Sequence, residues 1–170
     1  MSLENFIEIK PEEMENAQKL IGSDYMLITA GSPEHYNTMT ASWGCLGVLW
    51  SKPVCVCFIR PQRYTYEFVE SNDELTFSFF DESYKKALTF CGTHSGRDYD
   101  KAKECDLTPI PCGNKTTALG EAKLVLVCRK LFAQDMKEES FIDKALLENY
   151  KNNDFHRTYV CEIMKVYKRK

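Results

Sequence analysis

Two arginines and a threonine stand where an apolar run gives way to a helical pattern. The run VCVCFI at 54–59 is apolar and rich in β-branched residues, and RPQRYT at 60–65 follows it directly. A strand that leads into a helix start exposes free backbone N–H groups and the positive end of the helix dipole, and both suit an anion. Arg60, Arg63 and the Thr65 hydroxyl would add donors at this place, and the arginine fork matches phosphate oxygens.

A second basic segment, SGRDYDK at 95–101, carries two more cations. Arg97 and Lys101 are four residues apart, so one helix would place both on the same side. The acids Asp98 and Asp100 lie between them and could neutralise them on a solvated, charged helix. The segment therefore admits either an anion site or an ordinary polar surface.

The first basic segment has a similar alternative, in which Arg63 pairs with Glu67 on a solvated helix face. Together, however, the two segments supply four cations in a chain whose formal net charge is -3. An anionic ligand of such a chain must be held by local cations, because the overall field does not attract it. The combination indicates a phosphate site.

A third segment, NTMTASW at 37–43, places hydroxyl and amide groups in an otherwise strand-like run. Groups of this kind along one strand could hydrogen-bond the polar edge of a flat ring. A half-exposed edge strand, in which threonine is common, explains the same composition. From the residues alone, both interpretations stay open.

Motifs of nucleotide folds and of covalent hydrolysis are missing from the sequence. It has no phosphate-loop pattern, no G-x-G-x-x-G after a strand and no serine in a nucleophile elbow. It also has no CxxC pair, and His35, His94 and His156 do not cluster at ligand spacing. We therefore predict no metal site and assign no catalytic acid, base or nucleophile.

Cysteine usage and charge indicate the compartment. Cys55 and Cys57 alternate with valines, and Cys128 and Cys161 lie in similar strand-like runs, a pattern typical of buried free thiols in a reducing cytosol. A sequence pI of about 5.7 argues against non-specific nucleic-acid binding. No apolar run reaches the length of a membrane span, and no export signal opens the chain. We expect a cytoplasmic protein with neither a nucleic-acid nor a membrane partner.

The periodicity predicts a mainly β fold with short helices, in which a barrel has helices around it. Strand patterns cover 25–30, 38–43, 54–59, 75–80, 119–134 and 158–168, with a turn expected at 31–33. Because 54–59 is apolar throughout, we expect it to be a central strand covered on both faces. Helical patterns begin at Pro11 (ending at Gly22), after Pro61, at Tyr84 (ending at Gly92), at Ser95 and after Ser140.

Four motifs carry a family resemblance: NTMTASWGCLGVLWSKP, FIRPQRYTYEF, FSFF and CGTHSGRDYDK. In this order and at these separations they resemble the flavin-reductase-like FMN-binding proteins, a family that includes flavoredoxin. The similarity extends from the strand around Met26 to the strand around Glu162, so we treat 1–170 as a single domain of this kind. The resemblance implies an FMN-binding split β-barrel that forms a homodimer, with one FMN per subunit near the subunit interface.

The resemblance also implies which residues hold FMN. Those of the third segment, along the isoalloxazine edge, are Asn37, Met39, Thr40, Ala41, Ser42 and Trp43. Those around the phosphate and the ribityl chain are Arg60, Gln62, Arg63, Tyr64 and Thr65. The strand under the flavin contributes Ser78, Phe79 and Phe80, and a second phosphate-side loop contributes Gly92, Ser95, Arg97 and Lys101.

The expected activity is that of an NAD(P)H-dependent flavin reductase-like oxidoreductase. In related reductases a Gly-Asp-His stretch before the last strand is associated with the nicotinamide cofactor, whereas this chain has DFHR at 154–157. A flavoredoxin-type electron-transfer protein, with bound FMN and a redox protein partner, is therefore an alternative. A non-redox ligand-binding module is a second one. Cys45 and Cys91 lie within the motifs, and we interpret both as packing residues.

Overall fold

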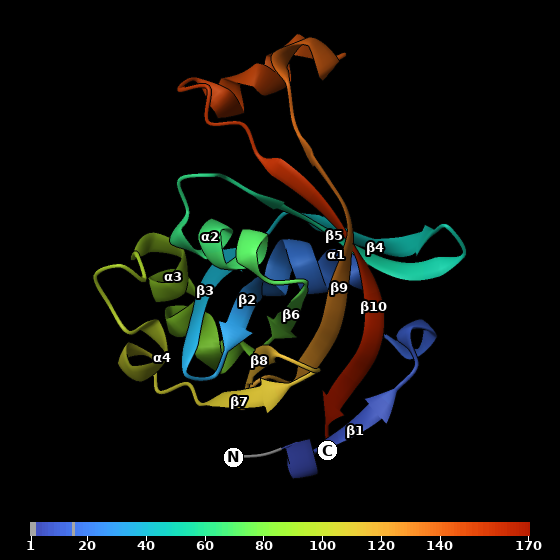
Figure 1. Cartoon of the computed structure of the whole chain (residues 1–170), viewed down its shortest axis with the longest axis vertical. Helices are drawn as coiled ribbons and strands as arrows, with labels where there is room; N and C mark the ends of the chain where they lie inside the picture. Colours follow the sequence, from blue (N-terminus) through green and yellow to red (C-terminus); the bar gives the residue numbers. More distant parts are fainter. Residues whose placement is uncertain (1–2, 15) are drawn as a thin grey trace.

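A computed structural model describes residues 3–14 and 16–170, and β-strands dominate it (Figure 1). The strands are β1 (Phe6–Ile9), β2 (Met26–Ser32), β3 (His35–Ala41), β4 (Gly44–Leu49), β5 (Lys52–Ile59), β6 (Glu74–Phe79), β7 (Pro109–Cys112), β8 (Thr116–Leu119), β9 (Leu124–Asp135) and β10 (Arg157–Arg169). The α-helices are short: α1 (Ala17–Lys19), α2 (Tyr64–Ser71), α3 (Lys85–Thr93) and α4 (Lys101–Glu104). The expected mainly β fold with short helices is confirmed.

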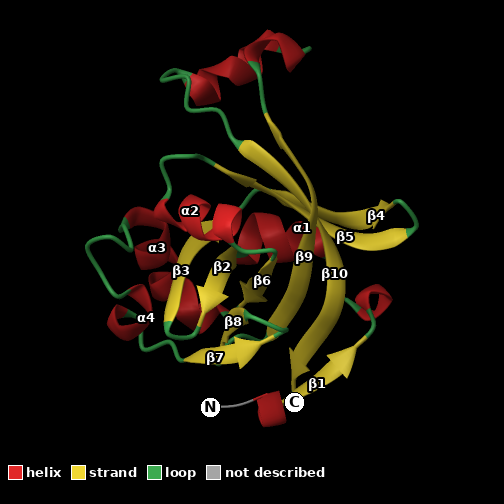
Figure 2. Cartoon of the chain, viewed as in Figure 1, coloured by secondary structure: helices red, strands yellow, loops and turns green. Residues whose placement is uncertain are grey.

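Eight of the strands form one antiparallel sheet that curls into an open barrel. Its order is β3-β2-β6-β9-β10-β5-β4, and β1 pairs with β10 beside this path. β7 and β8 form a separate hairpin. The long strand β10 has register shifts at Val160/Cys161 and Ile163/Lys165, and such irregularities bend a strand and increase its twist. Figure 2 shows α2, α3 and α4 gathered on one flank of the sheet.

β5 is not covered on both faces, whereas β6 is. All residues of β6 after Glu74 are buried, between β2 and β9. β5 lies between β10 and the edge strand β4, and its Val56 and Phe58 are partly exposed. The expectation of a central strand at 54–59 was therefore wrong, because an apolar run does not reveal which strands become its neighbours.

The single helix expected from Pro11 to Gly22 is replaced by three short pieces. A 3₁₀ turn at Pro11–Glu13 is followed by α1 and by a π-helical turn at Leu20–Asp24. The turn after β2 is also shifted, because Ser32 still pairs with His35.

The helix expected at Ser95 is a turn instead. The backbone N–H groups of Asp98 and Tyr99 both bond to the Ser95 carbonyl, and α4 begins only at Lys101. Asp100 caps α4 by accepting a hydrogen bond from the Lys103 N–H. Arg97 and Lys101 therefore do not share a helix, and the prediction that they lie on one helix face was wrong.

Two buried clusters lie on the two sides of the sheet. In one cluster, Phe68 and Val69 of α2 pack with β-strand residues such as Phe77. In the other, Leu88 of α3 and Ala102 of α4 pack against the opposite side. This packing brings the end of α3 and the beginning of α4 close to the first turn of α2 and to strand β3.

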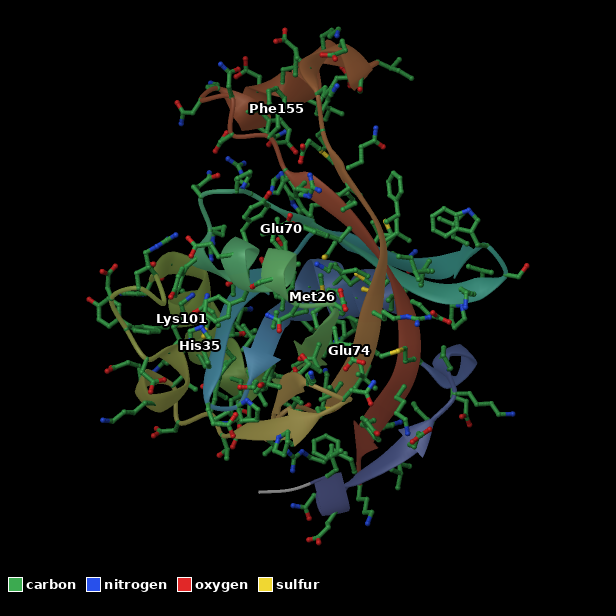
Figure 3. The ribbon with its side chains drawn as sticks, in the orientation of Figure 1. Met26, His35, Glu70, Glu74, Lys101 and Phe155 are labelled. Carbon is green, nitrogen blue, oxygen red and sulfur yellow. The ribbon has the colours of Figure 1, made fainter. Side chains whose placement is uncertain are left out.

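Between β9 and β10 the chain leaves the barrel as an arm, residues 136–156 (Figure 1). The arm contains two 3₁₀ segments, Glu138–Ser140 and Lys144–Tyr150, and Asp143 caps the second by accepting from the Ala145 N–H. Phe155, labelled in Figure 3, lies at its base and stacks on Tyr150 with ring centroids 4.9 Å apart. The helix expected after Ser140 is thus present as a 3₁₀ helix.

All eight cysteines are free, and six of them are buried. Cys45 is exposed and Cys105 is partly exposed. Among the residues that the structure describes, no helix is long and apolar enough to cross a membrane.

Candidate cofactor site

Arg63 joins the beginning of α2 to the end of α3. It is the N-cap residue of α2, and its guanidinium donates to the Gly92 carbonyl at 2.9 Å and to the Cys91 carbonyl at 3.5 Å. The sequence left open a pair between Arg63 and Glu67, but the Glu67 carboxylate pairs with Arg97 instead. Arg63 therefore brings its charge to the place where α2 exposes its first N–H groups.

Lys101 adds a second cation at the same place. Its side chain is only 5% exposed, and its Nζ donates to the Thr38 carbonyl at 2.8 Å and to the Cys91 carbonyl at 2.9 Å. Burial lowers the pKa of Lys101 to about 8, and the nearby Arg63 acts in the same direction. A lysine ammonium has three donors, so one remains beyond these two bonds. Figure 3 shows Lys101 near His35, beside the helices that cover β3.

These cations line a cavity of about 190 Å³, here called the basic cavity. Seven of the predicted cofactor residues line it: Gln62, Arg63, Tyr64, Thr65, Gly92, Ser95 and Lys101. Three neighbours that were not singled out, Thr93, His94 and Gly96, complete the lining. They lie inside the motif CGTHSGRDYDK, so the motif itself was the available signal.

Asn37 and Gly96 determine how closely the 92–98 loop approaches β3. The Asn37 amide donates to the Thr65 hydroxyl at 2.7 Å, and both side chains are buried. A Cβ on Gly96 would lie 1.8 Å from the Asn37 amide oxygen and 3.2 Å from the Tyr64 ring. Only glycine therefore fits at position 96 while Asn37 keeps its bond to Thr65.

The residues around the basic cavity fit a phosphate monoester. Two cations, the hydroxyls of Thr65 and Ser95, and the start of α2 line one small space, whereas the Thr93 hydroxyl donates to the Thr89 carbonyl. Phosphate oxygens accept only, so a set made almost entirely of donors suits them.

The third segment, residues 37–43, runs along β3 from this cavity and is called the ring-edge segment below. The Thr40 hydroxyl donates to the Leu88 carbonyl and so attaches β3 to α3. Met39 is buried in the core, whereas Ala41 and Ser42 are partly exposed. Ser42 and Trp43 line a larger cavity, of about 510 Å³, beside α1.

Trp43 also contacts the base of the arm. Its ring lies 5.2 Å from the ring of His156, whose Nδ1 is 2.9 Å from the Tyr150 hydroxyl. His156 is 9% exposed, and burial lowers its pKa to about 4, so this imidazole is neutral at pH 7. A buried, neutral and hydrogen-bonded ring orients the arm over Trp43 in the present conformation.

Arg60 and Arg97 do not line the basic cavity, and Gln62 lines it but directs its amide to the arm. The Arg60 guanidinium bonds to the Asp154 carboxylate and donates to the Asn149 carbonyl at 3.0 Å, and the Gln62 amide donates to Asp154 at 3.0 Å. Arg97 pairs with Glu67, with its guanidinium carbon 4.5 Å from the centre of the Tyr64 ring. In this conformation Arg60 and Gln62 attach the arm, and Arg97 covers α2.

The three residues predicted to lie under the flavin belong to the buried core of the protein. Ser78, Phe79 and Phe80 are each 2% exposed or less. The Ser78 hydroxyl is buried, and no hydrogen-bond partner for it lies among the described residues. These three side chains therefore support the sheet from within.

The fold matches several solved structures, FMN-binding proteins among them. An FMN-binding domain of a flavin reductases-like enzyme from Shewanella baltica aligns with a TM-score of 0.70 at 15% identity, over 97% of this chain and 78% of that one. Flavoredoxin of Desulfovibrio vulgaris aligns with a TM-score of 0.66 at 20% identity, over 86% of this chain and 69% of that one. Nitrilotriacetate monooxygenase component B from Bacillus cereus aligns with a TM-score of 0.67 at 16% identity, over 96% of this chain and 82% of that one. Because these sequence identities are low, the alignments show a shared split-barrel fold and nothing about activity.

No curated protein matches the sequence. The profile of the family described as "Flavin reductase like domain" does match it, over residues 19–170, which include every residue of the candidate site. The split barrel, the basic cavity at the start of α2 and this match agree with the resemblance carried by the four sequence motifs. The chain therefore belongs to the flavin reductase-like domain family.

Proposed function

We propose that the chain binds FMN, with the phosphate in the basic cavity, and acts as a flavin reductase-like oxidoreductase. The observation that carries this proposal is the meeting of Arg63 and Lys101 at the first turn of α2, in an otherwise acidic chain. The solved structures of similar fold support it, since FMN-binding proteins recur among them.

The chain's own residues would bind and orient the cofactor. Arg63 and the free N–H groups of α2 would hold the phosphate, and Lys101 would direct its remaining donor to the same oxygens. Residues Met39 to Ser42 of the ring-edge segment would offer backbone donors to the polar edge of the ring. Bound FMN would supply the redox chemistry, as an acceptor of hydride or of single electrons.

The proposal has two forms, and in the first of them NAD(P)H donates electrons to the bound flavin. His156, at the base of the arm, contacts Trp43 of the ring-edge segment. The arm would therefore control how the nicotinamide reaches the flavin ring. The alternative is an electron-transfer flavoprotein that is reduced by a redox protein. All eight cysteines are free, which supports a reducing, cytoplasmic compartment for either form.

An absorbance spectrum of the purified protein tests the proposal. Flavin bands that bleach when NADH or NADPH is added without oxygen would establish the reductase. Bands that persist would favour the electron-transfer protein. A colourless protein that does not bind added FMN would contradict the proposal and favour a non-redox binding module.

A matched pair of arginine variants tests where the phosphate lies. Arg63→Gln removes the cation that joins α2 to the carbonyls of α3, so we expect FMN affinity to fall by about tenfold to a hundredfold. Arg97→Gln removes an exposed cation that already pairs with Glu67, and we expect a much smaller change. Fluorescence titration with FMN measures both. Equal losses in the two variants would contradict the assignment of the basic cavity.

We also propose that the chain is a homodimer through the β4–β5 hairpin. Val48, Leu49 and Trp50 are exposed at its tip, and Trp50 contacts the exposed ring of Phe132, 6.3 Å between centroids. These four residues are called the hairpin patch below. An apolar patch on an edge strand favours a protein partner that covers it, and we take that partner to be a second copy of the chain.

A further inference from the structure

Two thiols outside the proposed FMN contacts lie together where α3 meets α4. Cys105 follows the last residue of α4, and its Sγ is 3.8 Å from the Ala87 carbonyl oxygen of α3. Ala87 is one turn before Cys91, and side chains on a helix lean toward its N-terminus. The Cys91 thiol therefore lies over the turn that Cys105 touches, close enough that each thiol shifts the pKa of the other.

The two thiols differ in their access to solvent. Cys105 is partly exposed, whereas Cys91 is completely buried. Burial raises the pKa of Cys91 to about 12, which keeps this thiol protonated. Burial also raises the pKa of Cys105, and the neighbouring Cys91 thiol and Lys101 ammonium oppose that effect only in part, so this pKa stays above its usual value. A reagent from solvent therefore meets Cys105 first, with Cys91 directly behind it.

We propose that Cys91 and Cys105 form a peroxide-oxidisable dithiol, with Cys105 as the attacking thiol and Cys91 as the resolving thiol. The Cys105 sulfur attacks one oxygen of hydrogen peroxide, the O–O bond breaks, and water leaves with the thiol proton. The Cys91 sulfur then attacks the Cys105 sulfur of this sulfenic acid, the S–O bond breaks, and the departing hydroxide takes the Cys91 thiol proton and leaves as a second water. The two thiols lose two electrons and two protons, and the peroxide takes up both.

The resulting disulfide would close the segment 92–104, which includes Gly92, Ser95 and Lys101 of the basic cavity. Oxidation would thereby restrain the loop that surrounds the proposed phosphate site. An effect on FMN retention rests on the proposed function, whereas formation of the disulfide does not.

The remaining cysteines provide internal controls. Cys55, Cys57, Cys128 and Cys161 are completely buried in the barrel, and we expect them to stay reduced in the folded protein. Cys45 is exposed, so Cys45→Ser is the background for every test protein and prevents disulfides between molecules.

The full-length Cys45→Ser protein is treated with hydrogen peroxide, denatured, alkylated and mapped by mass spectrometry. We expect a linked pair of peptides containing Cys91 and Cys105, and its loss on treatment with dithiothreitol. Adding Cys91→Ser should leave a sulfenic acid on Cys105 that dimedone traps, and adding Cys105→Ser should leave Cys91 reduced. The proposal fails if peroxide leaves both thiols free for alkylation, or if the disulfide joins a different pair. These measurements need no FMN, so they are independent of the proposed function.

Discussion

Lys101 carries its charge where water hardly reaches it, and two backbone carbonyls replace the lost hydration. Burial lowers its pKa to about 8, so the ammonium loses its proton in the folded protein well before it would in an unfolded chain. The charge on this residue therefore changes within a pH range that is accessible to binding experiments. A bound phosphate would favour the charged form and would be released as that form disappears.

We expect FMN affinity to fall about tenfold between pH 7 and pH 9, because only about a tenth of the Lys101 side chains keep the proton at the higher pH. Lys101→Met should bind FMN more weakly at pH 7 and should lose most of this pH dependence. Titration of both proteins with FMN at the two pH values is the measurement. Parallel pH profiles would show that Lys101 does not face the phosphate.

At the scale of elements, the loop between α3 and α4 depends on a close contact with β3. Asn37 is fixed by its bond to Thr65, so it cannot easily move away from a side chain at position 96. Gly96→Ala should shift the loop, cost about 1–3 kcal/mol of unfolding free energy and weaken FMN retention. Gly22→Ala is the matched control, since a Cβ at Gly22 would meet nothing within 4 Å. Thermal denaturation and the bound FMN fraction measure both variants, and equal behaviour of the two would argue against a rigid loop.

At the scale of the whole molecule, the β4–β5 hairpin, which carries Val48, Leu49 and Trp50 of the hairpin patch, projects from the barrel on the side opposite α3 and α4 (Figure 1). Val48 is 78% exposed and Trp50 is 58% exposed, and large apolar side chains in this position favour association. Val48→Asp should convert the dimer to a monomer, because a carboxylate would lose its hydration in the interface. Ile7→Asp, at an exposed site on β1, should leave the dimer intact. Sedimentation velocity distinguishes the two, and a wild-type monomer would overturn the proposed assembly.

Much of the architecture followed from local patterns. Strands at Met26–Ser32 and Glu74–Phe79 and the helix after Pro61 agree with the periodicity, because burial on a strand or helix leaves a local signature in the order of residues. The position of each strand in the sheet left no such signature. An apolar run at 54–59 was compatible with the centre of the sheet, yet β5 lies next to the edge.

The sequence by itself determined the residue types of the site, the strand-to-helix junction at Arg63 and the motifs of the family. Only the tertiary structure decided which cation meets which partner. Arg63 bonds to carbonyls 28 and 29 residues away, and Lys101 bonds to Thr38, 63 residues away. Arg97 pairs with Glu67, which is 30 residues away in the sequence, and not with the basic cavity. A charged side chain takes the partner that packing brings within reach, and these distances in sequence exceed what any local pattern encodes.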